Sequence, residues 1–109
     1  MNPRTIASGL LLFTGVAHVA EFVVRSHELP MAVFGAIYFA LGLWLRRPGK
    51  AGLIASTVLP AVGGLGGAMQ MSAGPVDPIL AGMVAIDVVV VACCVWTLAR
   101  GAAAGASSA

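Results

Sequence analysis

Apolar residues fill this chain in four long runs, which charged residues, prolines and short polar stretches separate at intervals of about 20 to 25 residues. Each run is apolar at nearly every position, whereas a membrane β-strand alternates apolar and polar residues over about ten positions. Helices satisfy their backbone hydrogen bonds within one segment, as lipid requires. The pattern therefore predicts an all-α, polytopic membrane protein. Its four-helix transmembrane bundle forms one domain over residues 1–100, with helices at about 5–24, 29–45, 51–71 and 78–99, and a disordered Gly/Ala/Ser tail at 101–109.

The composition agrees with a membrane protein. Of the 109 residues, 60% are hydrophobic and 9% are charged, whereas a soluble domain carries about 25% charged residues. The loops are too short to hold a separate water-soluble catalytic domain, so we predict no catalytic residues and no enzyme activity of the chain on its own. The Lys and Arg residues are too few and too scattered for a nucleic-acid surface, which excludes nucleic acid as a partner.

One alternative concerns the first run. The stretch Gly15-Val16-Ala17 follows an apolar segment and resembles the small-residue cleavage site of a signal peptide. Cleavage there would leave three helices. A signal peptide also needs a positive amino-terminal region, and here that region is little more than Arg4 and the amino terminus. We therefore expect the first run to stay as a transmembrane helix.

The positive charges predict the orientation of the bundle. Five of the six Lys and Arg residues fall on the side that holds both chain ends and the middle loop: Arg4, Arg46, Arg47, Lys50 and Arg100. Only Arg25 falls on the other side, together with the acidic residues Glu28 and Asp77. Under the positive-inside rule, the side rich in Lys and Arg is cytoplasmic. We predict a multi-pass protein of the inner (plasma) membrane with both termini in the cytoplasm.

Small residues predict where the helices meet, because membrane helices associate through close packing. They recur every four positions along the third run, at Gly52, Ser56, Pro60, Gly64 and Ala68, with Gly63 and Gly67 beside them. A shorter series on the second run consists of Ala32, Ala36 and Ala40. These surfaces could pack within one bundle, or they could form the seam of a homo-oligomer.

Ionisable residues inside a membrane are costly, and they mark functional sites by default. Thr14, His18, Glu21 and Arg25 are spaced four, three and four residues apart, which places them on one stripe of a helix. At a rise of about 1.5 Å per residue, His18 and Asp87 lie about 10 and 13 Å deep, measured from the end of the bundle near Arg25. The intramembrane polar site that we predict comprises Thr14, His18, Glu21, Arg25, Tyr38 and Asp87, around a cavity that opens to the outer face.

Structural roles could also account for these residues. Glu21 could pair with Arg25, and His18 could hydrogen-bond to Thr14 or to a backbone carbonyl. Asp87 precedes a run of four valines and has no charged neighbour within a turn. Its partner must therefore come from another helix, and His18 is the best candidate by depth.

A metal site is a further alternative, because His18, Glu21 and Asp87 could together hold zinc or iron. The sequence has no Glu-x-x-His repeat and no Cys-x-x-Cys pair to strengthen it. Four methionines in the outer half would suit copper(I), although methionine is also a flexible packing residue: Met31, Met69, Met71 and Met83. We interpret the adjacent Cys93 and Cys94 as small apolar residues of the packing.

Several short motifs resemble the DoxX-like family of small four-helix membrane proteins. They are Leu12-Phe13-Thr14-Gly15-Val16-Ala17-His18 in the first run, Leu29-Pro30 at the start of the second, and the basic turn Arg46-Arg47 followed by Gly52. The resemblance implies a four-helix membrane architecture. Some members of the family are similar to subunits of quinone-linked membrane oxidoreductases, so the resemblance also implies a quinone as a ligand to test.

Three functions follow as expectations. The first is a non-catalytic subunit or accessory protein of a membrane complex, and that complex could be quinone-linked. Its partners are the lipid bilayer and other membrane subunits. The second is a homo-oligomeric small transporter that couples protons to a cation or solute through Glu21 and Asp87. The third is an outward-facing metal-binding membrane protein. The residues themselves predict no cofactor, and quinone and a metal ion are the two that stay open.

Overall fold

The computed structural model of the chain describes residues 2–75 and 77–108. Within these ranges the chain is helical apart from short connections, and no strand occurs there. The elements in order are α1 (Pro3–Glu21), the π-helical turn η1 (Phe22–Ser26), α2 (Leu29–Trp44), α3 (Ala51–Ala73) and α4 (Pro78–Ser108). The predicted all-α fold with four α-helices is thus confirmed. Helices α1, α3 and α4 are long and apolar enough to cross a membrane, and α2 is a shorter apolar helix.

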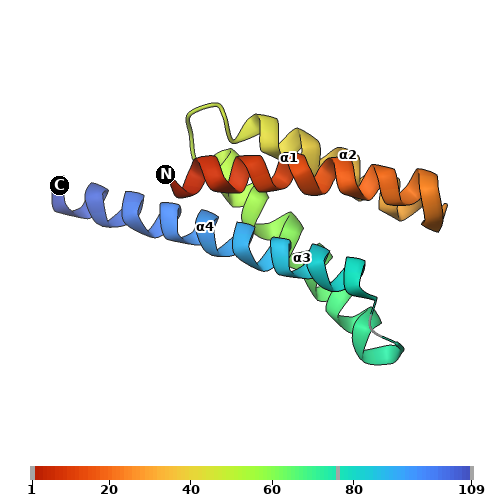
Figure 1. The fold of residues 1–109 in the computed structure, drawn as a ribbon. Helices are drawn as coiled ribbons and strands as arrows, with labels where there is room; N and C mark the ends of the chain where they lie inside the picture. Colours follow the sequence, from red (N-terminus) through yellow and green to blue (C-terminus); the bar gives the residue numbers. More distant parts are fainter. Residues whose placement is uncertain (1, 76, 109) are drawn as a thin grey trace.

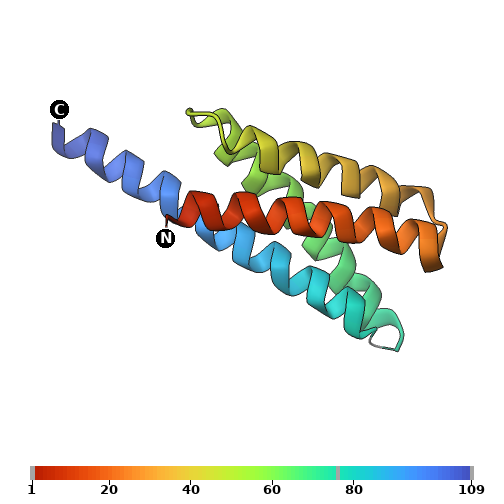
Figure 2. The same ribbon diagram turned by 45° about the horizontal axis from the view of Figure 1, so that its top comes forward.

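The helices form two antiparallel pairs, α1 with α2 and α3 with α4 (Figure 1). Contacts between α1 and α4 join the two pairs, whereas α2 and α3 touch each other little. The α2–α3 turn lies at the same end as the amino terminus, and the α1–α2 and α3–α4 connections lie at the opposite end. The pairs diverge toward that opposite end in both ribbon views (Figures 1 and 2).

We name the two ends by their charges. The basic end holds Arg4 at the start of α1 and the α2–α3 turn, whose basic residues are Arg46, Arg47 and Lys50. The acidic end is formed by η1, the α1–α2 connection and the α3–α4 connection. It carries Glu21, Glu28 and Asp77, and its only Lys or Arg is Arg25. The distribution of charge read from the sequence therefore corresponds to two ends of the folded bundle.

Local sequence explains where the helices begin and end. Asn2 caps α1, because its side-chain Oδ1 accepts a hydrogen bond of 2.8 Å from the backbone N–H of Arg4. Asp77 caps α4 in the same way, accepting from the N–H of Ile79 at 2.9 Å. The π-helical turn after α1 ends at His27, whose φ of 54° is left-handed and reverses the chain toward α2. Helix α4 continues to Ser108, where the composition predicts a disordered tail, and the alanines of that segment have the highest helix propensity.

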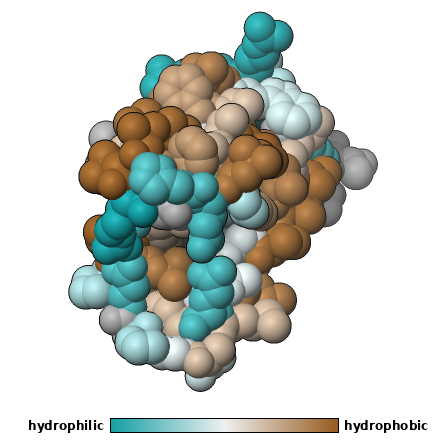
Figure 3. Space-filling view, turned by 90° about the vertical axis from the view of Figure 1, so that its right-hand side faces the viewer, coloured by the Kyte–Doolittle hydropathy of each residue, from teal (hydrophilic) through white to brown (hydrophobic). Residues whose placement is uncertain are grey.

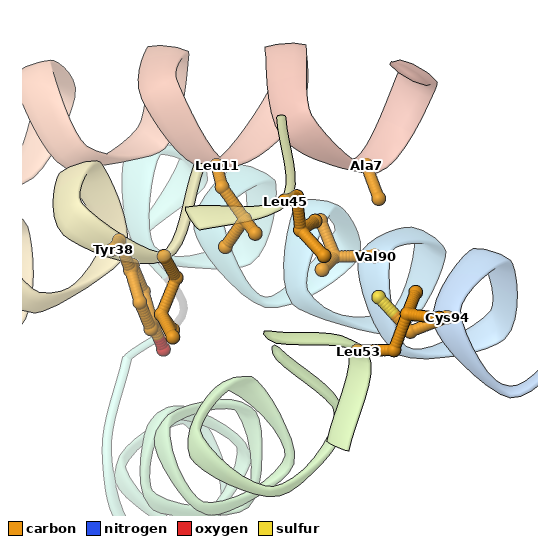
Figure 4. Packing of buried hydrophobic residues seen from close by; sticks show 8 residues of the cluster. Ala7, Leu11, Tyr38, Leu45, Leu53, Val90 and Cys94 are labelled. Atoms are coloured by element: carbon orange, nitrogen blue, oxygen red, sulfur yellow. The ribbon is translucent and has the colours of Figure 1, made fainter. Parts of the chain in front are cut away.

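A small apolar core lies where the two helix pairs meet (Figure 4). It contains residues from all four helices and the turn after α2: Ala7, Leu11, Tyr38, Leu41, Leu45, Leu53, Val90 and Cys94. Many other large apolar side chains point away from it, including Phe13, Val58 and Trp96, which are each more than half exposed. An outer surface of this kind is typical of helices that face lipid.

The series of small residues on α3 faces inward over most of its length. Gly52, Ser56, Pro60 and Gly64 are buried, and a Cβ added to Gly64 would lie 3.2 Å from the Cβ of Asp87 on α4. Ala68, the last residue of the predicted series, is exposed. Gly67 is buried beside Val84 of α4 instead, because the contact line between two crossing helices drifts away from a strict four-residue repeat.

The contact between α1 and α2 uses glycines and not the predicted alanine series. Gly35 and Gly42 of α2 are buried against α1, whereas Ala36 and Ala40 are exposed. Ser8 of α1 adds a hydrogen bond to this contact, because its hydroxyl donates to the carbonyl oxygen of Gly42 at 2.7 Å. Helices pack most closely where neither side has a Cβ, which explains the choice of glycine.

Arg4 fastens the α2–α3 turn to the start of α1. Its Nε donates to the carbonyl oxygen of Leu45 at 2.7 Å, and Nη1 donates to that of Gly49 at 3.0 Å. Its Nη2 donates to the carbonyl oxygen of Arg47. The last carbonyls of a helix lack intrahelical partners, so one guanidinium supplies donors that the end of α2 and the following turn need.

Candidate functional site

Two buried polar residues of α1 form a local hydrogen-bonded unit. His18 is 8% exposed and Thr14 is fully buried. The Nδ1 of His18 lies 2.7 Å from the carbonyl oxygen of Thr14 and 3.2 Å from the Thr14 hydroxyl. Because a carbonyl oxygen only accepts, we assign the hydrogen of the neutral ring to Nδ1. The other ring nitrogen, Nε2, is then available to accept a hydrogen bond from another group.

Tyr38 of α2 stands at the centre of a cluster of three rings. Its ring is perpendicular to that of His18, with 5.1 Å between the centroids and 88° between the planes. The ring of Phe34, one turn earlier on α2, meets Tyr38 at 5.9 Å and 61°. Edge-to-face arrangements of this kind are favourable for aromatic side chains. The cluster therefore fixes the position of the Tyr38 hydroxyl, which points toward α3 (Figure 4).

Asp87 of α4 is buried at 4% exposure, on the face of α4 that meets α3. Its side chain has Tyr38 as a hydrogen-bond partner, and the phenol is the donor. The other carboxyl oxygen, Oδ1, has no hydrogen-bond partner among the described residues. Buried polar atoms are nearly always satisfied, so this carboxyl oxygen is an exception, which it shares with the hydroxyl of Ser56.

Tyr38 therefore links the two buried ionisable residues that the sequence singles out. Its ring contacts His18 and its hydroxyl meets Asp87. The described residues show no direct ion pair or hydrogen bond between His18 and Asp87, which the depth argument had matched to each other. The three residues come from α1, α2 and α4, so the linkage exists only in the folded bundle.

A cavity of about 310 Å³, which we call the chamber, lies beside this cluster. His18 and the rings of Phe34 and Tyr38 line one side of it, and glycines of α3 line the other: Gly63, Gly66 and Gly67. A Cβ on Gly66 would meet no atom within 4 Å, whereas one on Gly63 would overlap the Tyr38 hydroxyl. The missing side chains of α3 thus create the space between α2 and α3.

A second cavity of about 220 Å³, which we call the vestibule, adjoins the chamber at the acidic end. The two cavities share five lining residues: Glu28, Met31, Gln70, Leu80 and Met83. Figure 3 looks onto this end of the molecule and shows hydrophilic residues arranged around a hollow. The chamber therefore has a polar entrance at the acidic end.

Glu21 belongs to the vestibule. Its Oε1 accepts from Nε of Arg25 at 2.6 Å, and Nη2 of the same guanidinium pairs with Asp77 of the α3–α4 connection. The N–H of Ile79, and then the Arg25 guanidinium, hold the pKa of Asp77 below its usual range. Arg25 thus joins the two helix pairs at the entrance. Glu21 and Asp87, predicted to act together, line separate cavities.

The structure brings together no metal site from the candidate ligands. Among the described residues, no group of three His, Cys, Asp or Glu side chains lies close enough to hold a metal ion. Met31 and Met83 line both the chamber and the vestibule, but Met69 and Met71 line neither. Cys93 and Cys94 are free thiols, and Cys94 is part of the apolar core.

Sequence reasoning did not identify Phe34 or Gly66 as parts of a site. Phe34 precedes Tyr38 by four residues, which is the spacing of one helical face, and this was the available signal. No such signal marks Gly66, because a glycine beside a cavity looks like any other small residue of a membrane helix.

Comparison with protein-family models, with curated proteins and with solved structures finds no match to this chain.

Proposed function

We propose that the four helices cross the inner membrane, with the basic end in the cytoplasm and the acidic end outside. The outward-facing apolar side chains support this placement, as do the five Lys and Arg residues on the proposed cytoplasmic side. Helix α2 has 16 residues and a length of about 24 Å, somewhat less than the hydrocarbon core of about 30 Å. The bilayer thins slightly around such a helix, at a modest energetic cost.

Within this frame, the function that the geometry supports best is that of a small transporter that binds a solute in the chamber. The observation that carries the proposal is the chamber itself, an apolar cavity with a few polar groups and an entrance at one end. Ligand sites are concave and mostly apolar, with a small number of polar groups that orient the ligand. Gly63 and Gly67 also have packing roles, beside the Tyr38 hydroxyl and Val84, whereas Gly66 meets nothing within 4 Å and leaves the space of the chamber open.

The linkage from His18 through Tyr38 to Asp87 supports coupling of the solute to protons. Asp87 lies behind Tyr38, away from the vestibule, and its unpartnered Oδ1 can hold a proton. Carboxylates and histidines inside the membrane form the proton relays of pumps and transporters. Asp87 is therefore the proton-carrying residue of the proposal, and Glu21 is part of the entrance.

The test uses purified protein and a panel of small cationic, neutral and anionic compounds, scored by the rise in unfolding temperature. Gly66→Leu fills the chamber, because Gly66 faces open space within it. Gly82→Leu on α4 is the matched control, since Gly82 also faces open space but lines no cavity of the site. We expect compounds that stabilise the wild type and Gly82→Leu but not Gly66→Leu.

Reconstituted vesicles then separate transport from binding alone. A stabilising compound should accumulate in wild-type vesicles under a proton gradient and should not accumulate with Asp87→Asn. A chamber that binds no compound of the panel would contradict the proposal. If a compound binds to the chamber but does not accumulate in the vesicles, the protein is not a transporter, and the chamber is the ligand site of a binding subunit.

An accessory role in a membrane complex is the second candidate, and a separate observation favours it. Two apolar grooves of about 560 and 510 Å³ run along the outside of the bundle, between α3 and α4 and between α1 and α2. Small residues such as Ala61 and Ala36 line them and would let a helix approach closely. In a quinone-linked complex of the kind implied by the DoxX-like resemblance, the Nε2 of His18 would accept a hydrogen bond from the hydroxyl of the reduced headgroup, a quinol.

The mass of the native particle extracted in mild detergent distinguishes the two candidates. A dimer or another small homo-oligomer is expected of the transporter. A large particle that contains other membrane proteins would favour the accessory subunit.

A further inference from the structure

We infer that the ligand of the chamber is a small organic cation, with its ammonium group held against the ring of Phe34, which Tyr38 supports. The inference rests on the proposed function, because it names the class of molecule that the chamber takes. Three features of the site carry it: the rings, the charge of the entrance and the apolar walls.

The rings supply the attraction for a cation. Phe34 and Tyr38 both line the chamber, with their centroids 5.9 Å apart and their planes inclined at 61°. An ammonium group over the face of an aromatic ring is attracted by the ring quadrupole. Phe34 is the ring open to such a group, because it is partly exposed, whereas Tyr38 is only 1% exposed and supports Phe34 from behind. The attraction strengthens when the cation is desolvated, and the largely apolar walls of the chamber replace part of its water shell.

The charges at the entrance also favour a positively charged ligand. The vestibule is lined by Glu21, Glu28 and Asp77 against a single arginine, and Arg25 already pairs with both Glu21 and Asp77. Among the described residues that line the chamber itself, there is no Lys or Arg. A cleft with an excess of negative charge concentrates cations at its mouth and repels anions. An anionic ligand would also find no Lys or Arg among the described residues of the chamber.

The remaining walls suit the organic part of such a ligand. Met31, Leu80 and Met83 line both the chamber and the vestibule, so an apolar surface leads inward from the entrance. Methionine side chains adapt to ligands of different shape. An inorganic cation needs several oxygen ligands at short range, whereas most of the chamber lining consists of rings, thioethers and aliphatic groups, and Glu28 and Gln70 lie where the chamber meets the vestibule. The chemistry therefore favours a substituted ammonium ion.

The experiment compares three probes that share one carbon skeleton and differ in charge. They are choline, its neutral analogue 3,3-dimethylbutan-1-ol, and the anion 3,3-dimethylbutanoate. Binding to the purified full-length protein in detergent is measured by titration calorimetry. We expect choline to bind at least about tenfold more tightly than the neutral analogue, and the anion not to bind. Raising the ionic strength should weaken the binding of choline, because it screens the entrance.

Variants locate the bound cation. Phe34→Leu removes one ring and should weaken choline binding by about twofold to thirtyfold, the range expected for one cation–π contact. Phe13→Leu is the control, because Phe13 is 64% exposed on the outside of α1 and does not line the chamber. Gly66→Leu should abolish binding by filling the space. Tyr38→Phe keeps the second ring and should retain most of the affinity.

The outcomes separate this inference from the proposed function. If the neutral analogue or the anion binds as well as choline and Gly66→Leu abolishes that binding, the chamber is a ligand site and the cation inference is wrong. If choline binds equally to Phe34→Leu and wild type, the rings do not hold the ammonium group, and the inference also fails. If no probe binds the wild type, the inference is overturned, and the compound panel decides separately whether the chamber binds anything.

Discussion

Gly15 of α1 and Gly35 of α2 face each other so closely that a Cβ on either residue would lie 2.8 Å from the carbonyl oxygen of the other. Real Cβ atoms do not approach other atoms this closely, so the two helices touch backbone to backbone at this point. The contact sets the distance between α1 and α2 and thereby the position of His18 relative to Tyr38.

Gly15→Ala should therefore destabilise the protein. The added methyl group would also meet the backbone nitrogen of Phe39 at 2.7 Å, and backbone atoms cannot move away without separating the helices. We expect a loss of about 1–3 kcal/mol in the free energy of unfolding, as for other overpacked sites, measured in detergent. Gly9→Ala on the same helix is the control, because a Cβ there meets nothing within 4 Å. Equal stability of the two variants would show that α1 and α2 are not in contact.

Gly64→Leu tests the contact between α3 and α4. Gly64 is buried against Asp87, so a leucine side chain there must push α4 away. Val58→Leu on the outward face of α3 should be tolerated, because Val58 is 53% exposed. The measurement is the yield of monodisperse protein after extraction. A similar yield for both variants would mean that this face of α3 does not pack on α4.

A double-mutant cycle tests the linkage at the centre of the site. Asp87→Ala and Tyr38→Phe each remove one side of the contact, and residues in direct contact show coupling energies of about 0.5–3 kcal/mol. The same cycle between Asp87→Ala and His18→Gln should give a smaller coupling energy, because the described residues show no direct bond between those side chains, which share only Tyr38 as a neighbour. A larger coupling with His18 than with Tyr38 would contradict the arrangement described above.

The pH dependence of stability should report on Asp77. Its pKa is lowered in the folded protein, first by the N–H of Ile79 and then by Arg25, so its stabilising effect is fully present above the unfolded pKa of about 3.9. The effect is lost as the pH falls through the lower folded pKa. On acidification from pH 6 to 3, the unfolding temperature of the wild type should therefore fall further than that of Asp77→Asn. Parallel curves would show that Asp77 is not bonded in its charged form.

Reporter fusions test the proposed orientation in the membrane. A reporter that is active only in the cytoplasm should be active after Arg100 and inactive when inserted at Gly74, in the connection between α3 and α4. A reporter active only outside the cytoplasm should give the opposite result. Activity of the cytoplasmic reporter at Gly74 and not after Arg100 would reverse the orientation.

The positions of the helices could be predicted because strong local signals mark them. Pro30 and Pro78 lie in the first turns of α2 and α4, and Asp77 supplies a cap. Helical spacing also placed Thr14 and His18 on one face, where the structure has them hydrogen-bonded. These features depend on residues that are close in sequence, so they can be predicted from the local sequence pattern.

The arrangement of the site could not be predicted, because it depends on where the helices cross. Arg25 lies in the π-helical turn after Glu21, and the sequence of that turn does not distinguish a π-helix from a continued α-helix. Depth alone matched His18 with Asp87, but the crossing of α1 with α2 inserts Tyr38 into the linkage. The small residues of α2 likewise gave two candidate faces, and only the crossing shows that Gly35 faces α1 and Ala36 does not.

Arg4 gives the fold an order of assembly. Its three carbonyl partners come 41 to 45 residues later in the chain, so they do not exist when α1 leaves the ribosome. The Arg4 guanidinium therefore cannot form these hydrogen bonds until α2 and the turn after it have been synthesised. Once the bonds form, residues 4–49 form a loop that the Arg4 side chain closes. Deleting residues 1–4 would remove these three hydrogen bonds, open the loop and leave the α2–α3 turn without its link to α1.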